Sequence, residues 1–222
     1  MHKKLIVACM AMAAFAAFAV TSVASASPVL THEGKVVATG TKVAGTLEPE
    51  TTSTFTSSLG NVHCNEATLT GTVTSNTGTH LAGEITKAEW GSKGETETKC
   101  TSWAGLVKPT PTGLPWCITS SKVATFTVRG GKCSEAAKPL SFTLDFPGFT
   151  CGFERAAASP VNGTNTTGTP ATLKITNQAF NRVHGSTFLC PSVGELDMAF
   201  YMYTDIEDVG GVNTHIGPLG IS

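Results

Sequence analysis

The feature of this sequence that most constrains its fold is an internal repeat that carries cysteines. With an offset of 87 residues Cys64 aligns with Cys151, and after a three-residue insertion the offset is 90 and Cys100 aligns with Cys190. The other matching positions are Lys35-Val36 with Lys122-Val123, Phe55-Thr56 with Phe142-Thr143, Gly78-Thr79 with Gly168-Thr169, Ile85-Thr86 with Ile175-Thr176, and Trp90 with Phe180. A repeat of this length predicts one structural unit that is present twice.

The first 26 residues are expected to lie outside the fold. Lys3 and Lys4 precede an uncharged, Ala-rich apolar run over residues 5–20, and Ala24-Ser25-Ala26 follows as a small-x-small cleavage site. This is the layout of a secretory signal peptide. The alternative is an uncleaved membrane anchor, but the apolar run is shorter than the roughly 20 residues that a membrane span needs. We therefore expect residues 1–26 to be cleaved, and the mature chain, which has no later apolar span, to be secreted or held at the cell surface.

Cysteine number and position predict three disulfides. The six cysteines after the expected cleavage site are Cys64, Cys100, Cys117, Cys133, Cys151 and Cys190. An even number of cysteines in an exported chain indicates disulfides, although many connectivities are open to six of them. If the halves are homologous, the simplest set is Cys64–Cys100, Cys151–Cys190 and Cys117–Cys133. The competing interpretation, a zinc site, lacks any CxxC spacing.

Composition and alternation predict an all-β fold. Thr occurs 35 times and Gly 23 times, and these residues favour pleated surfaces and turns over helices. Apolar and polar residues alternate over 67–74, 123–128 and 140–146, which is typical of half-buried strands. A more apolar run over 196–203 predicts a more deeply buried strand.

The chain divides at a join that is not a flexible linker. We expect the first antiparallel β unit at 27–113, the second at 114–204, and an irregular C-terminal tail over 205–222. The join at 110–121 contains Pro111, Pro115, Trp116 and Cys117, and this sequence favours two units packed as one compact, disulfide-stapled body over two separate beads. In unit length, strand spacing and one long-range disulfide per unit, the chain resembles immunoglobulin-like sandwiches. That resemblance implies a small antiparallel sandwich for each unit.

No catalytic motif or cofactor signature occurs in the sequence. A nucleophile elbow, a His-Glu-x-x-His helix, a phosphate-binding loop and a dinucleotide fingerprint are all missing. Charged residues make up 14% of the chain, and 15 Lys and Arg face 16 Asp and Glu, so there is no basic footprint for nucleic acid. The acidic run at 205–208 lacks the spacing of a calcium loop. We therefore expect no cofactor, no metal and no nucleic-acid partner, and catalysis is the weaker interpretation.

The best candidate ligand-binding residues are two tryptophans. Trp90 has an aromatic counterpart in the repeat and is expected in the core. Trp103 and Trp116 lie beside cysteines in segments rich in Gly, Pro and Thr, where each could either pack on a disulfide or form an aromatic platform for a sugar or a partner protein.

Three classes of function follow from these features. The favoured class is a secreted, non-catalytic binding or cell-surface protein whose partner is an extracellular protein or a carbohydrate. The alternatives are a secreted inhibitor or structural coat component, and, less favoured, a secreted hydrolase. Asn162 and Asn165 each begin an N-glycosylation sequon, and we expect both in a surface loop of the second unit.

Overall fold

The computed structural model describes residues 28–92, 99–204 and 217–222, and every regular element in this part of the chain is a β-strand. The all-β prediction is therefore confirmed. The strands are β1 (Leu30–His32), β2 (Lys35–Val36), β3 (Lys42–Leu47), β4 (Ser53–Ser57), β5 (Gly60–Cys64), β6 (Glu66–Asn76), β7 (Leu81–Gly91), β8 (Cys100–Ser102), β9 (Gly105–Thr112), β10 (Trp116–Lys122), β11 (Thr125–Gly130), β12 (Leu140–Phe146), β13 (Phe149–Arg155), β14 (Val161–Asn165), β15 (Thr172–Arg182), β16 (Val193–Thr204) and β17 (Gly217–Ile221). Among the described residues, no helix has the length and hydropathy of a membrane-crossing segment.

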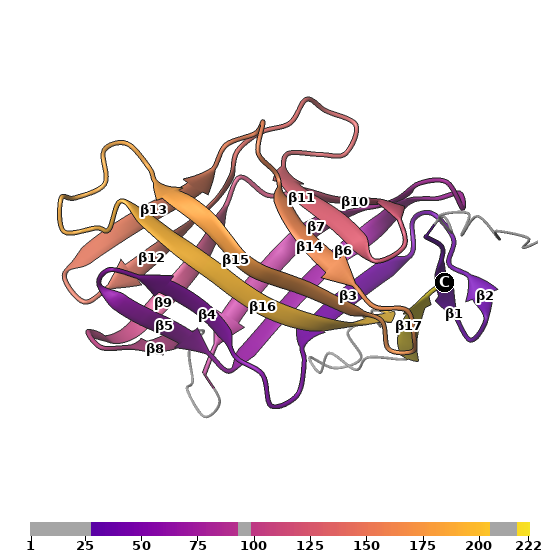
Figure 1. Ribbon diagram of the computed structural model, residues 1–222, viewed down its shortest axis with the longest axis horizontal. Helices are drawn as coiled ribbons and strands as arrows, with labels where there is room; N and C mark the ends of the chain where they lie inside the picture. The colour runs from indigo at the N-terminus through magenta and orange to yellow at the C-terminus, as the bar shows by residue number, and fades with distance from the viewer. Residues whose placement is uncertain (1–27, 93–98, 205–216) are drawn as a thin grey trace, which may run out of the picture.

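The strands form one antiparallel sheet that closes on itself twice. One ring of pairings runs β3-β6-β7-β10-β11-β14-β15-β16 and returns to β3. The other runs β16-β4-β5-β8-β9-β12-β13-β15 and returns to β16. The two rings share the long strands β15 and β16, which cross the front of the molecule from end to end (Figure 1). The result is a single elongated body with front and back layers.

The two halves of the sequence use matching pairings. In the first half β4 pairs with β5, and β6 pairs with both β3 and β7. In the second half β12 pairs with β13, and β14 pairs with both β11 and β15. With the repeat offset of 90 residues, β9 matches residues 195–202 of β16.

The last strand of each half pairs with the other half. β9 pairs with β12, while β16 pairs with β4 over its first part and with β3 over its second. β10, which begins the second half, pairs with β7 of the first half. The described strands thus form one large antiparallel sheet, which is consistent with one compact body. The arrangement as two tandem immunoglobulin-like units is not confirmed.

The disulfides have the predicted pairing. Cys64 bonds Cys100, Cys117 bonds Cys133 and Cys151 bonds Cys190. The first and third occupy matching places in the two halves, and both of their sulfur pairs are buried. These three disulfides are consistent with an extracellular environment.

One continuous apolar core connects the halves. Phe55 and Phe142, which occupy matching repeat positions, pack edge to face with ring centroids 5.5 Å apart. Phe153 lies 4.6 Å from Phe55, and Phe180 lies 5.1 Å from Phe142. Aromatic pairs in this geometry contribute about 0.5–1.5 kcal/mol each beyond the area that they bury. The core is therefore shared between the halves.

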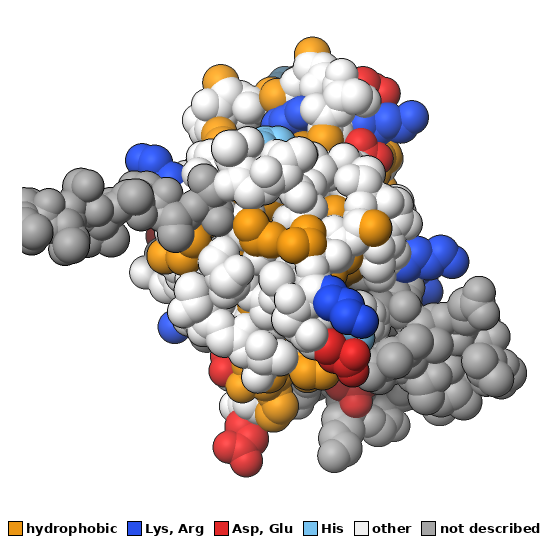
Figure 2. Space-filling view, turned by 90° about the vertical axis from the view of Figure 1, so that its right-hand side faces the viewer, with side chains coloured by type: hydrophobic (Ala, Val, Ile, Leu, Met, Phe, Trp, Pro, Cys, Tyr) orange, Lys and Arg blue, Asp and Glu red, His pale blue; other side chains and the backbone are white. Residues whose placement is uncertain are grey.

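A small flap of strands covers one end of the body. β1 pairs with β2 and β17, and β17 also pairs with the end of β16. The Asn76 side chain holds this flap: its Oδ1 accepts from Leu30 N at 3.0 Å, and its Nδ2 donates to Leu30 O at 2.8 Å and to Val37 O at 2.9 Å. Seen end-on, this face carries apolar side chains near its middle, with charged side chains mostly toward its margins (Figure 2).

Two local predictions differ from the structure. Asn162 and Asn165 lie on strand β14 and not in a surface loop; Asn162 is exposed, but Asn165 is only 4% exposed. The tail was expected to be irregular, yet residues 217–221 form β17, because their buried Leu219 and Ile221 complete the core at that end. Residues 205–216, which include the acidic run, lie outside the described residues, as does the expected signal peptide at 1–26.

Candidate functional site

The structure separates the two tryptophans that the sequence singles out. Trp103 is 65% exposed in the turn between β8 and β9, where its ring lies against Gly60. Trp116 begins β10 and is 5% exposed, and its Nε1 donates to Thr112 O at 3.1 Å. The two therefore do not form a common surface platform. Trp116 faces the interior instead, as does Trp90, which the sequence correctly places in the core.

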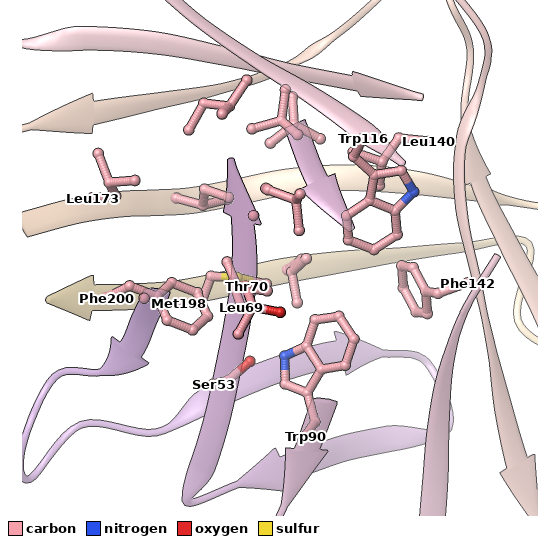
Figure 3. A pocket seen from close by; sticks show the side chains of 18 of the residues that line it. Ser53, Leu69, Thr70, Trp90, Trp116, Leu140, Phe142, Leu173, Met198 and Phe200 are labelled. Atoms are coloured by element: carbon pink, nitrogen blue, oxygen red, sulfur yellow. The ribbon is translucent and has the colours of Figure 1, made fainter. Parts of the chain in front are cut away.

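That interior holds a cavity of about 110 Å³ between the front and back layers. Its walls come from both halves of the chain, and Figure 3 labels ten of the lining residues, among them Leu69, Trp90, Trp116, Phe142, Leu173 and Phe200. Protein interiors are packed closely, with few voids larger than a water molecule. At about 24 cal/mol per Å³, a void of this size costs about 2.6 kcal/mol of stability. Because the cavity lowers the stability of the fold by this amount, we consider it the main candidate for a binding site.

The two buried tryptophans form one wall of this cavity. The ring centroids of Trp90 and Trp116 are 6.4 Å apart and the ring planes are inclined by 46°. Figure 3 shows the two rings on neighbouring sides of the space, with Phe142 beside them. Large, rigid aromatic faces give a ligand extensive contact at a low cost in side-chain entropy. This wall therefore suits a flat or cyclic apolar molecule.

Glycines contribute to the space. Gly45 on β3 and Gly83 on β7 both line the cavity. A Cβ on Gly45 would meet Met202 Sδ at 3.4 Å, an ordinary contact, so Gly45 leaves space that a larger residue could occupy. At Gly83 an added Cβ would lie 3.2 Å from the Thr72 carbonyl, which is a tight fit. Strand β6 beside them carries two register shifts against β7, and such irregularities bend a strand away from its neighbours.

Ser53 and Trp90 each contribute a polar atom to this mainly apolar wall, which also includes Thr70, Thr72 and Glu84. Ser53, at the start of β4, is 2% exposed and lines the cavity, and its hydroxyl has no hydrogen bond to any described residue. The indole N–H of Trp90 also has none among the described residues, in contrast to that of Trp116. In Figure 3 the Trp90 nitrogen is on the side of the ring toward Ser53. Buried polar groups are normally hydrogen-bonded, so this pair could receive a ligand oxygen.

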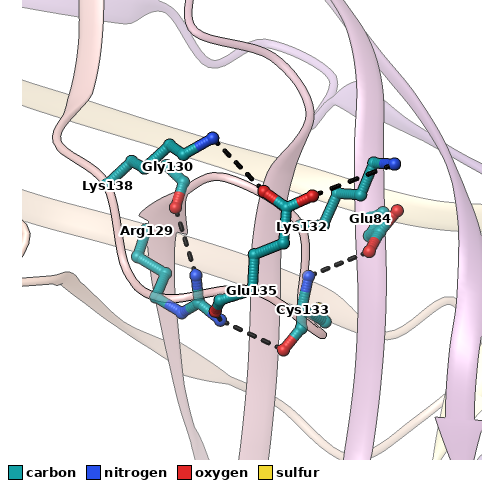
Figure 4. Close-up of polar contacts among 7 residues, drawn as sticks. All are labelled: Glu84, Arg129, Gly130, Lys132, Cys133, Glu135 and Lys138. Carbon is teal, nitrogen blue, oxygen red and sulfur yellow. Dashed lines mark hydrogen bonds and ion pairs between the residues drawn. The ribbon is translucent and has the colours of Figure 1, made fainter.

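The cavity carries no charge that could hold an ion. Glu84 is the one ionisable side chain that lines it within the described part of the chain. Its Oε1 accepts a hydrogen bond from Cys133 N at 2.9 Å, so the carboxylate is directed toward the loop that follows β11 (Figure 4). A buried ion without a partner charge is strongly disfavoured. The cavity therefore favours an uncharged ligand.

The loop that engages Glu84 is itself held firmly. Arg129 donates to the carbonyls of Gly130, Cys133 and Glu135 at 3.1–3.2 Å, and Lys138 Nζ lies 3.2 Å from Glu135 Oε2 (Figure 4). The Cys117–Cys133 disulfide ties the loop to β10. This network fixes the outer side of β7 and β10, two of the strands that wall the cavity.

Exposed apolar residues gather at the opposite end from the flap. Of the six large apolar residues that are exposed in the described chain, only Val36 lies on the flap. The other five lie in the β8–β9 hairpin, in the loop after β15 and at the start of β16: Trp103, Leu106, Phe188, Leu189 and Val193. We call these five residues the apolar end. Clusters of exposed apolar residues commonly mark interaction surfaces.

Sequence reasoning identified neither Ser53 nor the cavity. Ser53 lies in a run of Thr and Ser residues, and nothing in the sequence distinguishes it from its neighbours as a buried or binding residue. A signal for the cavity was present only indirectly, because Trp90 and Phe180 share a repeat position and both line it.

Comparison with protein-family models, with curated proteins and with solved structures finds no match for this chain. Any functional interpretation therefore depends on the geometry described above.

Proposed function

We propose that this protein is a secreted, non-catalytic binding protein, and that its ligand is a small, uncharged, mostly apolar molecule held in the central cavity. The observation that carries the proposal is the cavity itself: about 110 Å³, walled mainly by aromatic and aliphatic side chains, with Ser53 and Trp90 among the residues that line it. A dry cavity of about 150 Å³ binds benzene, so a single ring is the right scale of ligand.

The polar pair defines the expected ligand more closely. An indole N–H can only donate, and a serine hydroxyl can donate or accept. A ligand oxygen, such as that of a ketone, an alcohol or a phenol, would satisfy both groups at once. We therefore expect a cyclic alcohol or ketone to bind more tightly than the hydrocarbon of the same size.

The test uses the cavity tryptophans as reporters. In a Trp103→Phe variant, fluorescence comes from Trp90 and Trp116 alone, because the chain has three tryptophans. Titration with cyclohexanone, benzyl alcohol and benzene should change this emission, and saturating ligand should raise the melting temperature.

Matched substitutions control the experiment. Leu69→Phe adds volume inside the cavity and should abolish the response, whereas Leu106→Phe makes the same change on the surface, where Leu106 is 38% exposed, and should leave the response intact. If Leu69→Phe does not fold, Ser53→Ala serves instead and should remove the preference for the oxygenated ligands. Binding that is unchanged in these variants, or no binding at all, would rule out the cavity as the site.

The two-unit organisation is part of the proposal. We infer that the halves descend from one duplicated unit. The repeated cysteine positions and the recurrence of each half's strand pairings support this inference. Phe55 and Phe142, which occupy matching repeat positions and contact each other, both line the cavity.

A second candidate function is attachment to a partner protein through the apolar end. The specific observation is the exposure of Trp103 at 65% and Phe188 at 88% at the same end of the body. We expect Trp103→Ala to release the protein from the surface of the cells that produce it, while Val36→Ala, an exposed apolar change on the flap, has no effect. Equal retention of both variants would remove this candidate.

Assembly as a coat component has less support. A strand with a free edge can recruit a strand from a neighbouring molecule. In the described chain only β2, two residues long, has a single strand neighbour. An inhibitory role would depend on the exposed loop held by Arg129 and Cys133, and that loop carries no further sign of a target.

A further inference from the structure

A second, smaller cavity lies next to the central one. It measures about 60 Å³ and extends to the flap, since Leu30 of β1 and Ile221 of β17 both line it. It shares lining residues with the central cavity, among them Val43, Leu173 and Met202. The two spaces are therefore neighbours, and Met202, which lines both, has a flexible side chain that can adapt its shape between them.

Asn165 is the unexplained group of this second cavity. It ends β14, it is 4% exposed, and it lines the cavity. Its backbone N donates to Ala124 O at 3.2 Å, but neither Oδ1 nor Nδ2 of the side chain has a hydrogen-bond partner. A buried polar group that is left unsatisfied costs about 1–3 kcal/mol.

The other polar residues of this cavity are satisfied. Ser120 Oγ donates to the carbonyls of Lys122 and Thr125 at 2.9 and 2.7 Å, and Thr119 Oγ1 lies 3.0 Å from Thr127 Oγ1. No ionisable side chain lines the cavity within the described residues. The Asn165 side chain thus has one acceptor and one donor without a partner, in surroundings that are mainly apolar and uncharged.

Water alone is a poor partner for Asn165. A buried water molecule typically makes about three hydrogen bonds to polar groups. The remaining walls of this cavity are mainly apolar, with Leu30, Leu81, Phe126 and Leu173 among them, so a water molecule bound to Asn165 would lack further partners.

We propose that Asn165 is the recognition group for an uncharged carboxamide of the bound ligand. This inference rests on the proposed function, because it places the ligand's apolar body in the central cavity and its amide group beside Asn165. A primary amide, or a lactam, presents a carbonyl oxygen and an N–H on the same side. It therefore pairs with the Asn165 side chain through two parallel hydrogen bonds. A carboxylate would match the shape but would bury a charge with no partner.

The probes are phenyl-substituted amides of increasing chain length: phenylacetamide, 3-phenylpropanamide and 4-phenylbutanamide. Each is compared by calorimetry with the methyl ester of the same acid, which keeps the acceptor but lacks the donor, and with the alkylbenzene of the same length. We expect at least one amide to bind the native protein tenfold or more tighter than its ester and its alkylbenzene. The optimal chain length then reports the separation of the two subsites.

Two leucine variants on the same strand complete the design. Asn165→Leu should reduce amide affinity to that of the alkylbenzene and leave alkylbenzene affinity unchanged, and it should raise the melting temperature because an unsatisfied amide is replaced by an apolar group of similar size. Asn162→Leu, at an exposed position of β14, should change none of these values.

The outcomes separate the two proposals. Alkylbenzenes that bind without any preference for amides would overturn the role of Asn165 and leave the central cavity as the site. A preference for amides that survives in Asn165→Leu would also overturn it. If Asn165→Leu fails to fold, the comparison of amide with ester in the native protein decides alone. If no probe of any kind binds, the proposed function fails as well.

Discussion

Two asparagines show how differently the same residue can be used in this protein. The Asn76 side chain makes three hydrogen bonds to the backbone and fastens the flap. Asn165 is more deeply buried, and its side chain makes none. A polar side chain that contributes nothing to the fold and is nevertheless buried is better explained by what it binds than by what it stabilises.

The two candidate tryptophans should respond oppositely to truncation. Trp116→Ala removes a side chain that is 5% exposed and leaves a larger void, so the free energy of unfolding should fall by about 3–5 kcal/mol. Trp103→Ala, at a position 65% exposed, should change it by less than about 1 kcal/mol. Urea denaturation followed by circular dichroism measures both. Similar losses in the two variants would contradict the placement of these side chains.

Tyr201 should titrate at an unusually high pH. A hydrogen bond to the Glu48 side chain raises the pKa of the Tyr201 hydroxyl, and desolvation and the nearby negative charge of Glu48 raise it further. The folded state therefore holds this proton more tightly than the unfolded state. The resulting stabilisation is present below the unfolded pKa and is lost as the pH rises through the folded pKa.

Ultraviolet absorbance of tyrosinate measures this titration. The chain has two tyrosines, so Tyr203→Phe isolates the Tyr201 signal. In that background Glu48→Gln should lower the Tyr201 midpoint toward the ordinary value for tyrosine. A midpoint that does not respond to Glu48→Gln would show that the hydrogen bond is not its cause.

At the scale of elements, the flap should be the part of the fold that opens first. β1 has three residues and is held by β17 and Asn76, and β2 has two residues and pairs with β1 alone in the described chain. Short elements with few contacts open at lower free energy than central strands. Because Leu30 and Ile221 line the second cavity, opening of the flap would also give the proposed ligand a route to it.

Asn76→Ala tests this role of the flap. Loss of three hydrogen bonds should increase hydrogen exchange in β1 and β17 by tenfold or more while exchange in β12 and β15 changes little. Ligand dissociation should accelerate in the same variant. Ser75→Ala, which removes the neighbouring hydroxyl that donates to His80 O at 3.2 Å, is the matched control and should leave exchange in β1 unchanged.

Strands with regular alternation could be predicted from the sequence, and those without it could not. The run 140–146 alternates strictly and forms β12 over the same residues. Segment 162–165, Asn-Gly-Thr-Asn, has the composition of a turn but forms part of β14. The physical reason is tertiary: Gly163 pairs with Phe126, and a side chain at Gly163 would overlap the Phe126 ring, so glycine is required by packing and not by a turn.

At the scale of the whole molecule, the repeat predicted the disulfides but not the exchange of strands. Cys64–Cys100 and Cys151–Cys190 follow from matching positions, because each lies within one half. Whether β9 and β16 pair with strands of their own half or of the other half depends on how the halves pack together. No short sequence pattern predicts this pairing. The cavities could not be predicted for a related reason, since a void is set by the arrangement of all the strands around it.

Unfolding should involve both halves at once. Trp90 and Trp103 lie in the first half, whereas Trp116 and both tyrosines lie in the second. Since β9 and β16 each pair with the other half, the fluorescence of tryptophan and the absorbance of tyrosine should report one transition with the same urea midpoint. Two separated midpoints would show that the halves are independent domains.

The reciprocal pairing of β9 with β12 and of β16 with β4 means that neither half is complete without a strand from its counterpart. In a protein made of one half alone, the final strand of each copy would have to pair with the sheet of a second copy. Its smallest stable form would then be a strand-swapped homodimer with a two-fold axis near Phe55 or Phe142. If the halves descend from one duplicated unit, as we propose, the present chain corresponds to such a dimer made covalent. Each half could then change its residues independently, which would allow the proposed polar positions Ser53, Trp90 and Asn165 to differ from their counterparts in the other half.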